Sequence, residues 1–230
     1  MKRWIDSANN AIEGVLHAAR TERHVQYHLF TAIAVLLLSY ALGISRDDFL
    51  VVAVIVIMVL LAEMLNTAIE HLVDLVSPQY HEHARCAKDI AAGAVLVTAF
   101  GALILGYIIL YPYLADTFKN GMKIARHTSA EIALLAFVTV IIMVIIVKAW
   151  TGKGHPLRGG MPSGHTAVAF SLWVAIVLMT EQFTVALGTF LLSCMVARSR
   201  VSNGVHTVTE VVIGALLGAG VTFVLFKIFL

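Results

Sequence analysis

Seven apolar runs, separated by polar segments or by segments with Gly or Pro, constrain this chain more than any other feature. Of the 230 residues, 60% are hydrophobic and 13% are charged, which is more apolar material than a water-soluble domain of this size can bury. A helix needs about 20 apolar residues to cross about 30 Å of hydrocarbon, so the shorter runs must extend into polar flanks. The sequence therefore predicts an all-α integral membrane protein with about seven transmembrane helices, over Leu29–Ile44, Phe49–Ala62, Ile90–Tyr111, Ile132–Val147, Thr166–Met179, Phe183–Ala197 and Val211–Leu230.

The N-terminus lacks the layout of a signal peptide. Lys2 and Arg3 are followed by an amphipathic stretch that contains Ile12, Val15 and Leu16 among polar residues. Such a stretch predicts a surface helix lying on the bilayer.

The longest polar interruption, Pro112–Ala130, separates three apolar runs from four. The two halves share no motif, which argues against a small transporter built from inverted repeats. We predict a membrane domain at 1–112, a polar linker at 113–130 and a second membrane domain at 131–230. The net charge of +2 is spread over loops, so we expect no nucleic-acid partner.

Four polar residues of the first half follow one helical stripe: Glu63, Asn66, Glu70 and Asp74. Carboxylates within a membrane span normally face a protein interior or an aqueous cavity and have a function there. The alternative is a buried polar stripe that only joins helices. If the second span runs from Phe49 to about Val76, all four lie on a membrane helix.

Three further charged residues complete this set: Glu22 before the first span, and Lys88 and Asp89 at the start of the third. A lysine can hold phosphate as a point charge. Carboxylates with few soft ligands suit Mg²⁺, which binds through one or two of them together with the phosphates of a nucleotide.

Glu22, the run EMLNTAIEHLVD from Glu63 and the run AKDIAAGAVL from Ala87 resemble the bacterial diacylglycerol kinase and undecaprenol kinase family over residues 1–112. The resemblance implies ATP and Mg²⁺ as cofactors and a homotrimer with composite sites between protomers. It implies Glu63 as the general base on the lipid hydroxyl and Asn66 as a positioning residue. It further implies metal binding by Glu22 and Glu70, phosphate binding by Lys88, and Asp74 and Asp89 near the nucleotide.

The second half contains a glycine-rich segment that ends in Pro162-Ser163-Gly164-His165 immediately before an apolar run. Glycine-rich backbone beside a helix N-terminus binds anions, although a segment of this composition can also be a simple turn. Ser199, Arg200 and His206 precede the last span, with Glu210 one turn beyond His206. A histidine with a carboxylate partner is typical of a nucleophile or an acid whose orientation is fixed.

These motifs resemble the type 2 phosphatidic acid phosphatase superfamily over residues 131–230. The resemblance implies His206 as the nucleophile that forms a phosphohistidine and His165 as the acid for the leaving group. It implies no metal, and it places Arg158, Ser163, Gly164 and Arg200 around the phosphate.

This half departs from the superfamily pattern at three points. Glu210 stands where an Asp is usual, Arg158 is followed by Gly159 instead of Pro, and the lysine spacing matches neither Lys148 nor Lys153. We favour Lys153, because it lies in the loop, whereas Lys148 can end its span by snorkelling.

A cytoplasmic N-terminus places both sites on the cytoplasmic face, with 11 Lys and Arg residues inside and 5 outside, in agreement with the positive-inside tendency. We expect a multi-pass protein of the bacterial inner membrane that acts on lipid in the bilayer.

The leading hypothesis is a bifunctional lipid kinase and lipid phosphate phosphatase, with undecaprenol or diacylglycerol as the alcohol and undecaprenyl pyrophosphate or phosphatidate as the phosphate. The alternatives are that only one half is active beside a scaffold, or that the chain is a small transporter.

Overall fold

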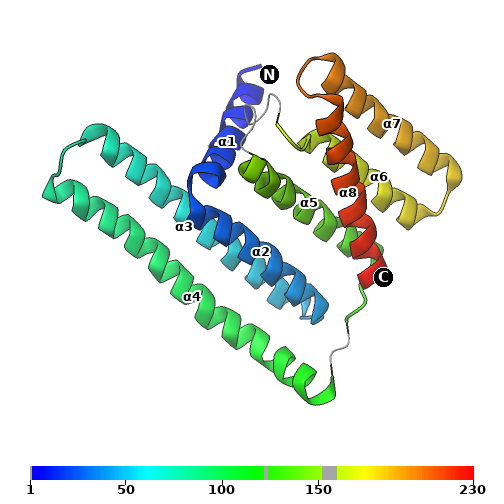
Figure 1. Cartoon of the computed structure of the whole chain (residues 1–230). Coiled ribbons are helices and arrows are strands. Elements are labelled where there is room, and N and C mark those ends of the chain that lie inside the picture. The colour runs from blue at the N-terminus through cyan, green and yellow to red at the C-terminus, as the bar shows by residue number, and fades with distance from the viewer. Residues whose placement is uncertain (1, 122–123, 152–159) are drawn as a thin grey trace. The chain divides into compact units, whose positions relative to one another are not determined.

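The computed structural model describes residues 2–121, 124–151 and 160–230, and within these ranges it contains eight helices and no strand (Figure 1). The prediction of an all-α protein is therefore confirmed. The helices are α1 (Lys2–Thr21), α2 (Arg23–Ala41), α3 (Arg46–Val76), α4 (Glu82–Asn120), α5 (Ser129–Thr151), α6 (Gly164–Thr180), α7 (Phe183–Ser202) and α8 (Val208–Phe229).

Six helices in the described ranges are long and apolar enough to cross a membrane: α2, α3, α4, α5, α7 and α8. The helix α6 is also apolar but has only 17 residues. At 1.5 Å per residue it is about 25 Å long, slightly less than the thickness of the hydrocarbon core. All seven predicted apolar runs thus lie largely within helices, although the first run extends past the end of α2 to Ile44 and one helix is shorter than a full span. The chain is a multi-pass, all-α integral membrane protein.

The chain divides into two compact units. The central unit comprises Thr21–Ala125, and the terminal unit comprises Met1–Arg20 together with Arg126–Leu230. The second boundary falls within the predicted linker at 113–130. The first 20 residues, which the sequence placed in the first domain, group with the second half instead.

In the central unit, α3 packs against both α2 and α4. The start of α3 is fixed by Ser45, whose hydroxyl accepts a hydrogen bond from the Asp48 N–H at 3.1 Å. The Asp48 carboxylate accepts a second bond from the Tyr113 hydroxyl of α4 at 2.8 Å. These contacts join the first turn of α3 to the last third of α4.

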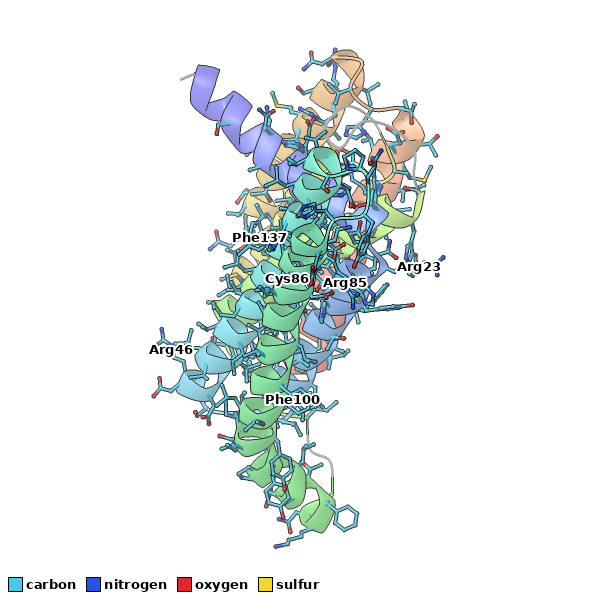
Figure 2. All side chains as sticks on the ribbon, turned by 90° about the vertical axis from the view of Figure 1, so that its left-hand side faces the viewer. Arg23, Arg46, Arg85, Cys86, Phe100 and Phe137 are labelled. Atoms are coloured by element: carbon cyan, nitrogen blue, oxygen red, sulfur yellow. The ribbon has the colours of Figure 1, made fainter. Side chains whose placement is uncertain are left out.

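The helix α4 continues past Pro112 to Asn120, so residues 113–120 of the predicted linker are helical. A membrane helix tolerates proline where neighbouring groups compensate for the lost backbone bond. At 1.5 Å per residue its 39 residues span about 58 Å, which exceeds the hydrocarbon core. Phe100 lies on the outside of α4 (Figure 2) and is 62% exposed, so this helix presents apolar surface to lipid or to other chains.

In the terminal unit, α6 packs against α5, α7 and α8, most extensively against α8. The close approach of α6 and α8 requires two glycines. A Cβ on Gly214 would lie 2.5 Å from the Ser163 carbonyl oxygen, and a Cβ on Gly218 would overlap the backbone of α6. Small residues four apart allow membrane helices to pack this closely. The hydroxyls of Ser171 and Thr222, 2.7 Å apart, join the same two helices.

The N-terminal α1 is helical, as its amphipathic pattern predicts. Ile12, Val15 and Leu16 lie on one face of α1 and line a cavity whose other walls come from α5, α6 and α7. Leu16 is only 3% exposed. The apolar face of this helix is therefore turned towards the terminal unit.

Candidate functional site

The carboxylate of Glu63 is buried within the central unit. Glu63 lies near the middle of α3 and is 5% exposed. Its Oε2 atom is 3.9 Å from Nε2 of His28 on α2. A carboxylate held away from water beside an imidazole is an environment that suits proton transfer.

Asn66 and Glu70 follow Glu63 at successive turns of α3. The Asn66 side-chain amide donates a hydrogen bond to Oε1 of Glu70 at 2.9 Å. The Asn66 Oδ1 atom is buried and has no hydrogen-bond partner among the described residues. A buried acceptor without a donor is costly, so this atom is available to accept a hydrogen bond from a water molecule or a ligand.

Charged residues form two pairs where α3 ends and α4 begins. Nζ of Lys88 lies 2.6 Å from Oδ1 of Asp74, and Nε of Arg85 lies 3.4 Å from Oδ2 of Asp89. The side chains of Asp74 and Asp89 are about two-thirds exposed, so these pairs contribute little to stability. They remain accessible to a soluble anionic ligand.

The predicted Mg²⁺ ligands are Glu22 and Glu70. Glu22 precedes α2 as its N-cap residue, and its side chain makes no capping hydrogen bond. The described residues contain no group of three or more His, Cys, Asp or Glu side chains that would hold a metal ion alone. The two carboxylates fit Mg²⁺ as oxygen ligands that need nucleotide phosphates and water to complete the coordination.

In the terminal unit, Glu210 holds His206 in one orientation. Nδ1 of His206 lies 2.8 Å from Oε2 of Glu210. Because a carboxylate only accepts, Nδ1 carries the proton and Nε2 keeps its lone pair. The same carboxylate accepts hydrogen bonds from the N–H groups of Thr207 and Gly160, both at 3.2 Å. Thr207 and Glu210 form a capping box at the start of α8, which fixes the carboxylate.

Burial determines the protonation of His206, which lies between α7 and α8. The residue is 6% exposed. This burial lowers the pKa of the imidazole below its ordinary value of 6.5, although the hydrogen bond to Glu210 acts in the opposite direction. His206 is therefore neutral near pH 7, the form that a nucleophile requires.

The Pro162–His165 segment contacts Glu210 through its backbone. The Ser163 N–H donates to the Glu210 carbonyl oxygen at 2.9 Å. The Ser163 hydroxyl is fully buried, 3.0 Å from the hydroxyl of Thr166. Gly164 and His165 open α6 and line the same cavity as His206. The structure thus brings His165 and His206 together, 41 positions apart in the chain.

Two cations accompany these histidines. The Arg200 carbonyl accepts the N–H of His206 at 3.1 Å, and the Arg200 Nε atom is buried without a hydrogen-bond partner among the described residues. Lys148 lines the cavity and is 4% exposed. The snorkelling predicted for Lys148 is therefore wrong, because the end of α5 is covered by the rest of the unit. Lys153 and Arg158 lie outside the described residues.

This arrangement combines a neutral, oriented imidazole, a second histidine and buried positive charge at the N-terminus of a helix. Positive charge beside the N-terminus of a helix is an environment that favours an anion. The sequence interpretation set Lys148 aside in favour of Lys153, and it missed Thr207 and the two packing glycines. The T-x-x-E pattern of Thr207–Glu210 and the G-x-x-x-G pattern of Gly214–Gly218 are the signals that predict the last three.

Comparison with known proteins identifies the first half. Residues 9–110 match the family described as prokaryotic diacylglycerol kinase. An undecaprenol kinase of Bacillus subtilis is 39% identical over 114 residues, which cover 50% of this chain and 93% of that protein. A diacylglycerol kinase of Synechocystis is 43% identical over 100 residues, 43% of this chain and 57% of that protein.

A diacylglycerol kinase of Pseudomonas aeruginosa is 26% identical over 112 residues, 46% of this chain and 91% of that protein. No solved structure matches the chain. The family match ends at residue 110 and does not reach the site around His206. Through residues 9–110, the chain belongs to the prokaryotic diacylglycerol kinase family.

Proposed function

We propose that the chain is a bifunctional lipid enzyme, a kinase of a lipid alcohol in its first half and a phosphatase of a lipid phosphate or pyrophosphate in its second. Family membership supports the kinase. The phosphatase is supported by one observation above the others: His206 is oriented by Glu210, and Arg200, whose charge acts on His206, has a buried Nε atom without a hydrogen-bond partner among the described residues.

For the kinase, we assign Glu63 as the general base that removes the proton of the lipid hydroxyl. The hydroxyl oxygen attacks the γ-phosphorus of ATP, the bond from that phosphorus to the bridging oxygen breaks, and ADP leaves. Nε2 of His28 lies 3.9 Å from the Glu63 carboxylate. Asn66 positions Glu70 through its hydrogen bond, and its Oδ1 atom, which has no partner among the described residues, would accept a hydrogen bond from a ligand. Because phosphoryl transfer depends mainly on positioning and charge neutralisation, no glycine-rich loop is required.

The nucleotide-binding residues of the kinase are those near the start of α4 and the predicted metal ligands. Lys88 exchanges its contact with Asp74 for the phosphates of ATP, and Asp89 lies one residue further along α4. Glu22 and Glu70 would hold Mg²⁺, which would neutralise phosphate charge. In a homotrimer these residues form sites between protomers.

For the phosphatase, Nε2 of His206 attacks phosphorus, and the bond from phosphorus to the leaving oxygen breaks. His165 gives its proton to that oxygen. Water then attacks the phosphohistidine, phosphate leaves, and His165 recovers a proton from the attacking water. Arg200, Lys148 and the N–H groups at the start of α6 stabilise the negative charge.

Undecaprenol and diacylglycerol are the candidate alcohols, because relatives with these activities match the first half. With undecaprenol, phosphorylation of the alcohol and hydrolysis of undecaprenyl pyrophosphate yield the same product. With diacylglycerol and phosphatidate the two halves would oppose each other. We therefore favour undecaprenyl phosphate as the product, made in a bacterial inner membrane by a protein with a cytoplasmic N-terminus.

The kinase assignment is tested by Glu63→Gln, which keeps the size of the side chain and removes the base. We expect ATP-dependent lipid phosphorylation to fall by about 10²- to 10⁴-fold, the usual contribution of a general base. Transfer of labelled γ-phosphate from ATP to undecaprenol measures the rate. A rate close to that of the wild type would show that Glu63 is not the base.

The phosphatase assignment is tested by trapping the covalent intermediate. Rapid acid-free quenching of the enzyme during turnover of a ³²P-labelled lipid phosphate should leave an acid-labile label on the peptide that contains His206. His206→Ala should abolish both the label and phosphate release, whereas His83→Ala, at an exposed histidine of the central unit, should change neither. Label that persists in His206→Ala would contradict the assignment.

A further inference from the structure

The cavity of the terminal unit has a volume of about 580 Å³ and a polar side at one end only. This volume lies within the range of small-molecule sites in proteins. The polar side chains in its lining are those of Lys148, His165 and His206, which surround the proposed phosphate position. The proposed phosphate position therefore lies at one end of a larger apolar cavity, and we call this polar end the head.

The apolar part of the cavity follows two helices away from that head. On α5, Val144 and Ile141 lie one and two turns before Lys148, and on α6, Val168 and Leu172 lie one and two turns beyond His165. Since α5 and α6 pack together and each turn rises about 5.4 Å, the lining extends roughly 10 Å from the head. An elongated hydrocarbon chain matches this shape.

The remaining wall comes from the far end of the sequence. Ile12, Val15 and Leu16, at i, i+3 and i+4 of α1, face the cavity. Leu16 is buried, whereas Ile12 is 47% exposed, so the space beside Ile12 is not filled by other side chains of the described chain. The helix α1 lies partly in the segment that matches the kinase family, yet its first 19 residues belong to the terminal unit and complete a cavity of that unit.

The lining also limits what kind of lipid fits. Beyond Lys148, Gly164, His165 and His206, every lining residue in the described chain is apolar. A glycerolipid phosphate carries ester carbonyls between its phosphate and its chains. Burying these groups against such a wall without donors would cost free energy. A hydrocarbon chain attached directly to the phosphate avoids this cost.

From these observations we infer that the cavity binds the hydrocarbon chain of a prenyl-type phosphate or pyrophosphate, and that α1 is the wall that determines which chains fit. This inference rests on the proposed phosphatase function. It assigns Ile12 as a specificity-determining residue of a site whose reacting groups lie more than 130 residues further along the chain.

The test compares a long and a short substrate on the full-length protein. Farnesyl pyrophosphate carries a chain that reaches past the first turn of the lining, whereas isopentenyl pyrophosphate does not. Ile12→Trp fills the cavity from the α1 side. We expect kcat/KM for farnesyl pyrophosphate to fall at least tenfold and kcat/KM for isopentenyl pyrophosphate to stay within twofold.

The matched control is Asn10→Trp, which adds the same bulk to an exposed position of α1 outside the cavity lining. Asn10→Trp should leave kcat/KM unchanged for both farnesyl pyrophosphate and isopentenyl pyrophosphate. The wild type should also turn over farnesyl pyrophosphate at least tenfold faster, as kcat/KM, than a phosphatidate of similar hydrocarbon content. Equal effects of Ile12→Trp on both pyrophosphates, or a preference for phosphatidate, would overturn the inference.

Photolabelling separates this inference from the proposed function. A farnesyl phosphate with a diazirine on its chain should label peptides of α1 and α6 in the wild type and in His206→Ala, and Ile12→Trp should remove the label. If neither pyrophosphate releases phosphate but this labelling pattern holds, the phosphatase function fails and the chain site stands. If phosphate is released but α1 is never labelled, the chain site fails alone.

Discussion

At the scale of single residues, His206 is prepared for one role by its neighbours. The Glu210 carboxylate accepts the proton of Nδ1 in a hydrogen bond, and burial keeps the ring neutral. The backbone N–H of His206 donates to the Arg200 carbonyl at 3.1 Å. The cations Lys148 and Arg200 act in the same direction as burial, since positive charge disfavours imidazolium. The hydrogen bond to Glu210 and the lowered pKa together favour a neutral ring whose Nε2 atom carries no proton.

The acid limb of the pH profile for phosphate release should reflect this environment. Protonated His206 cannot attack phosphorus, so activity is lost as the pH falls through the pKa of the folded protein. Because that pKa lies below 6.5, neutral His206 persists to lower pH than a free imidazole would. Glu210 raises this pKa, so in Glu210→Gln the acid limb of kcat/KM should move to still lower pH.

The wild type and Glu210→Gln are compared on the same substrate, so titration of the substrate's phosphate affects both pH profiles equally. Glu210→Gln should also reduce kcat, because the ring loses the carboxylate that orients it. An acid limb that moves to higher pH in Glu210→Gln would contradict the role of Glu210.

Lys88 offers a second test at the residue scale. Its ion pair with Asp74 lies largely in solvent, so Lys88→Ala should change stability by no more than about 1 kcal/mol. If Lys88 binds nucleotide phosphate, the KM for ATP should rise about tenfold, a loss of roughly 1.4 kcal/mol in binding. Lys119→Ala, at the exposed end of α4, is the control, and an unchanged KM for ATP in Lys88→Ala would exclude the assignment.

At the scale of helices, periodic apolar patterns predict where helices form but not how they group. The seven apolar runs lie largely within helices, and the amphipathic N-terminus is helical. The run of polar residues after Pro112 suggested a linker, yet α4 continues to Asn120 because a single proline removes only one backbone donor. The packing of α1 on the terminal unit joins residues far apart in sequence, which no local pattern encodes.

The candidate sites also combine features that local patterns predict with features that depend on contacts between helices. Spacing along α3 predicts the stripe of Glu63, Asn66 and Glu70, and the His206–Glu210 hydrogen bond agrees with their spacing of one turn. The burial of Lys148 and the proximity of His28 to Glu63 depend on contacts between helices. Pattern alone therefore selected a loop lysine in preference to one that lines the cavity.

The contact between α6 and α8 provides a test at this scale. In Gly218→Ala the new Cβ overlaps the backbone of α6, so the helices must separate, at a cost of about 1–3 kcal/mol. Because this contact places Ser163 beside Glu210, phosphate release should fall together with the melting temperature in detergent. Gly220→Ala, where a Cβ meets nothing within 4 Å, is a matched control on the same helix.

Lipid phosphorylation in Gly218→Ala should remain near the wild-type rate, because α8 contributes no residue to the kinase site. A melting temperature and a phosphatase rate equal to those of Gly220→Ala would show that the close approach of the two helices is not required.

At the scale of the whole molecule, the chain is composed of two units with separate sets of polar residues. The central unit carries the carboxylate face of α3, and the terminal unit carries the paired histidines. The family match accounts for the first set only, so the second rests on its own geometry. If both are active on prenyl lipids, two different reactions supply one lipid phosphate.

The most direct measurement of this account uses wild type, Glu63→Gln and His206→Ala, each purified in detergent. Each is incubated with undecaprenol, undecaprenyl pyrophosphate, diacylglycerol and phosphatidate, with and without Mg²⁺ and ATP. The account predicts that Glu63→Gln loses only ATP-dependent phosphorylation and that His206→Ala loses only phosphate release, with undecaprenyl phosphate as the common product. A wild type in which either activity is missing on every lipid, or one substitution that removes both activities, would contradict it.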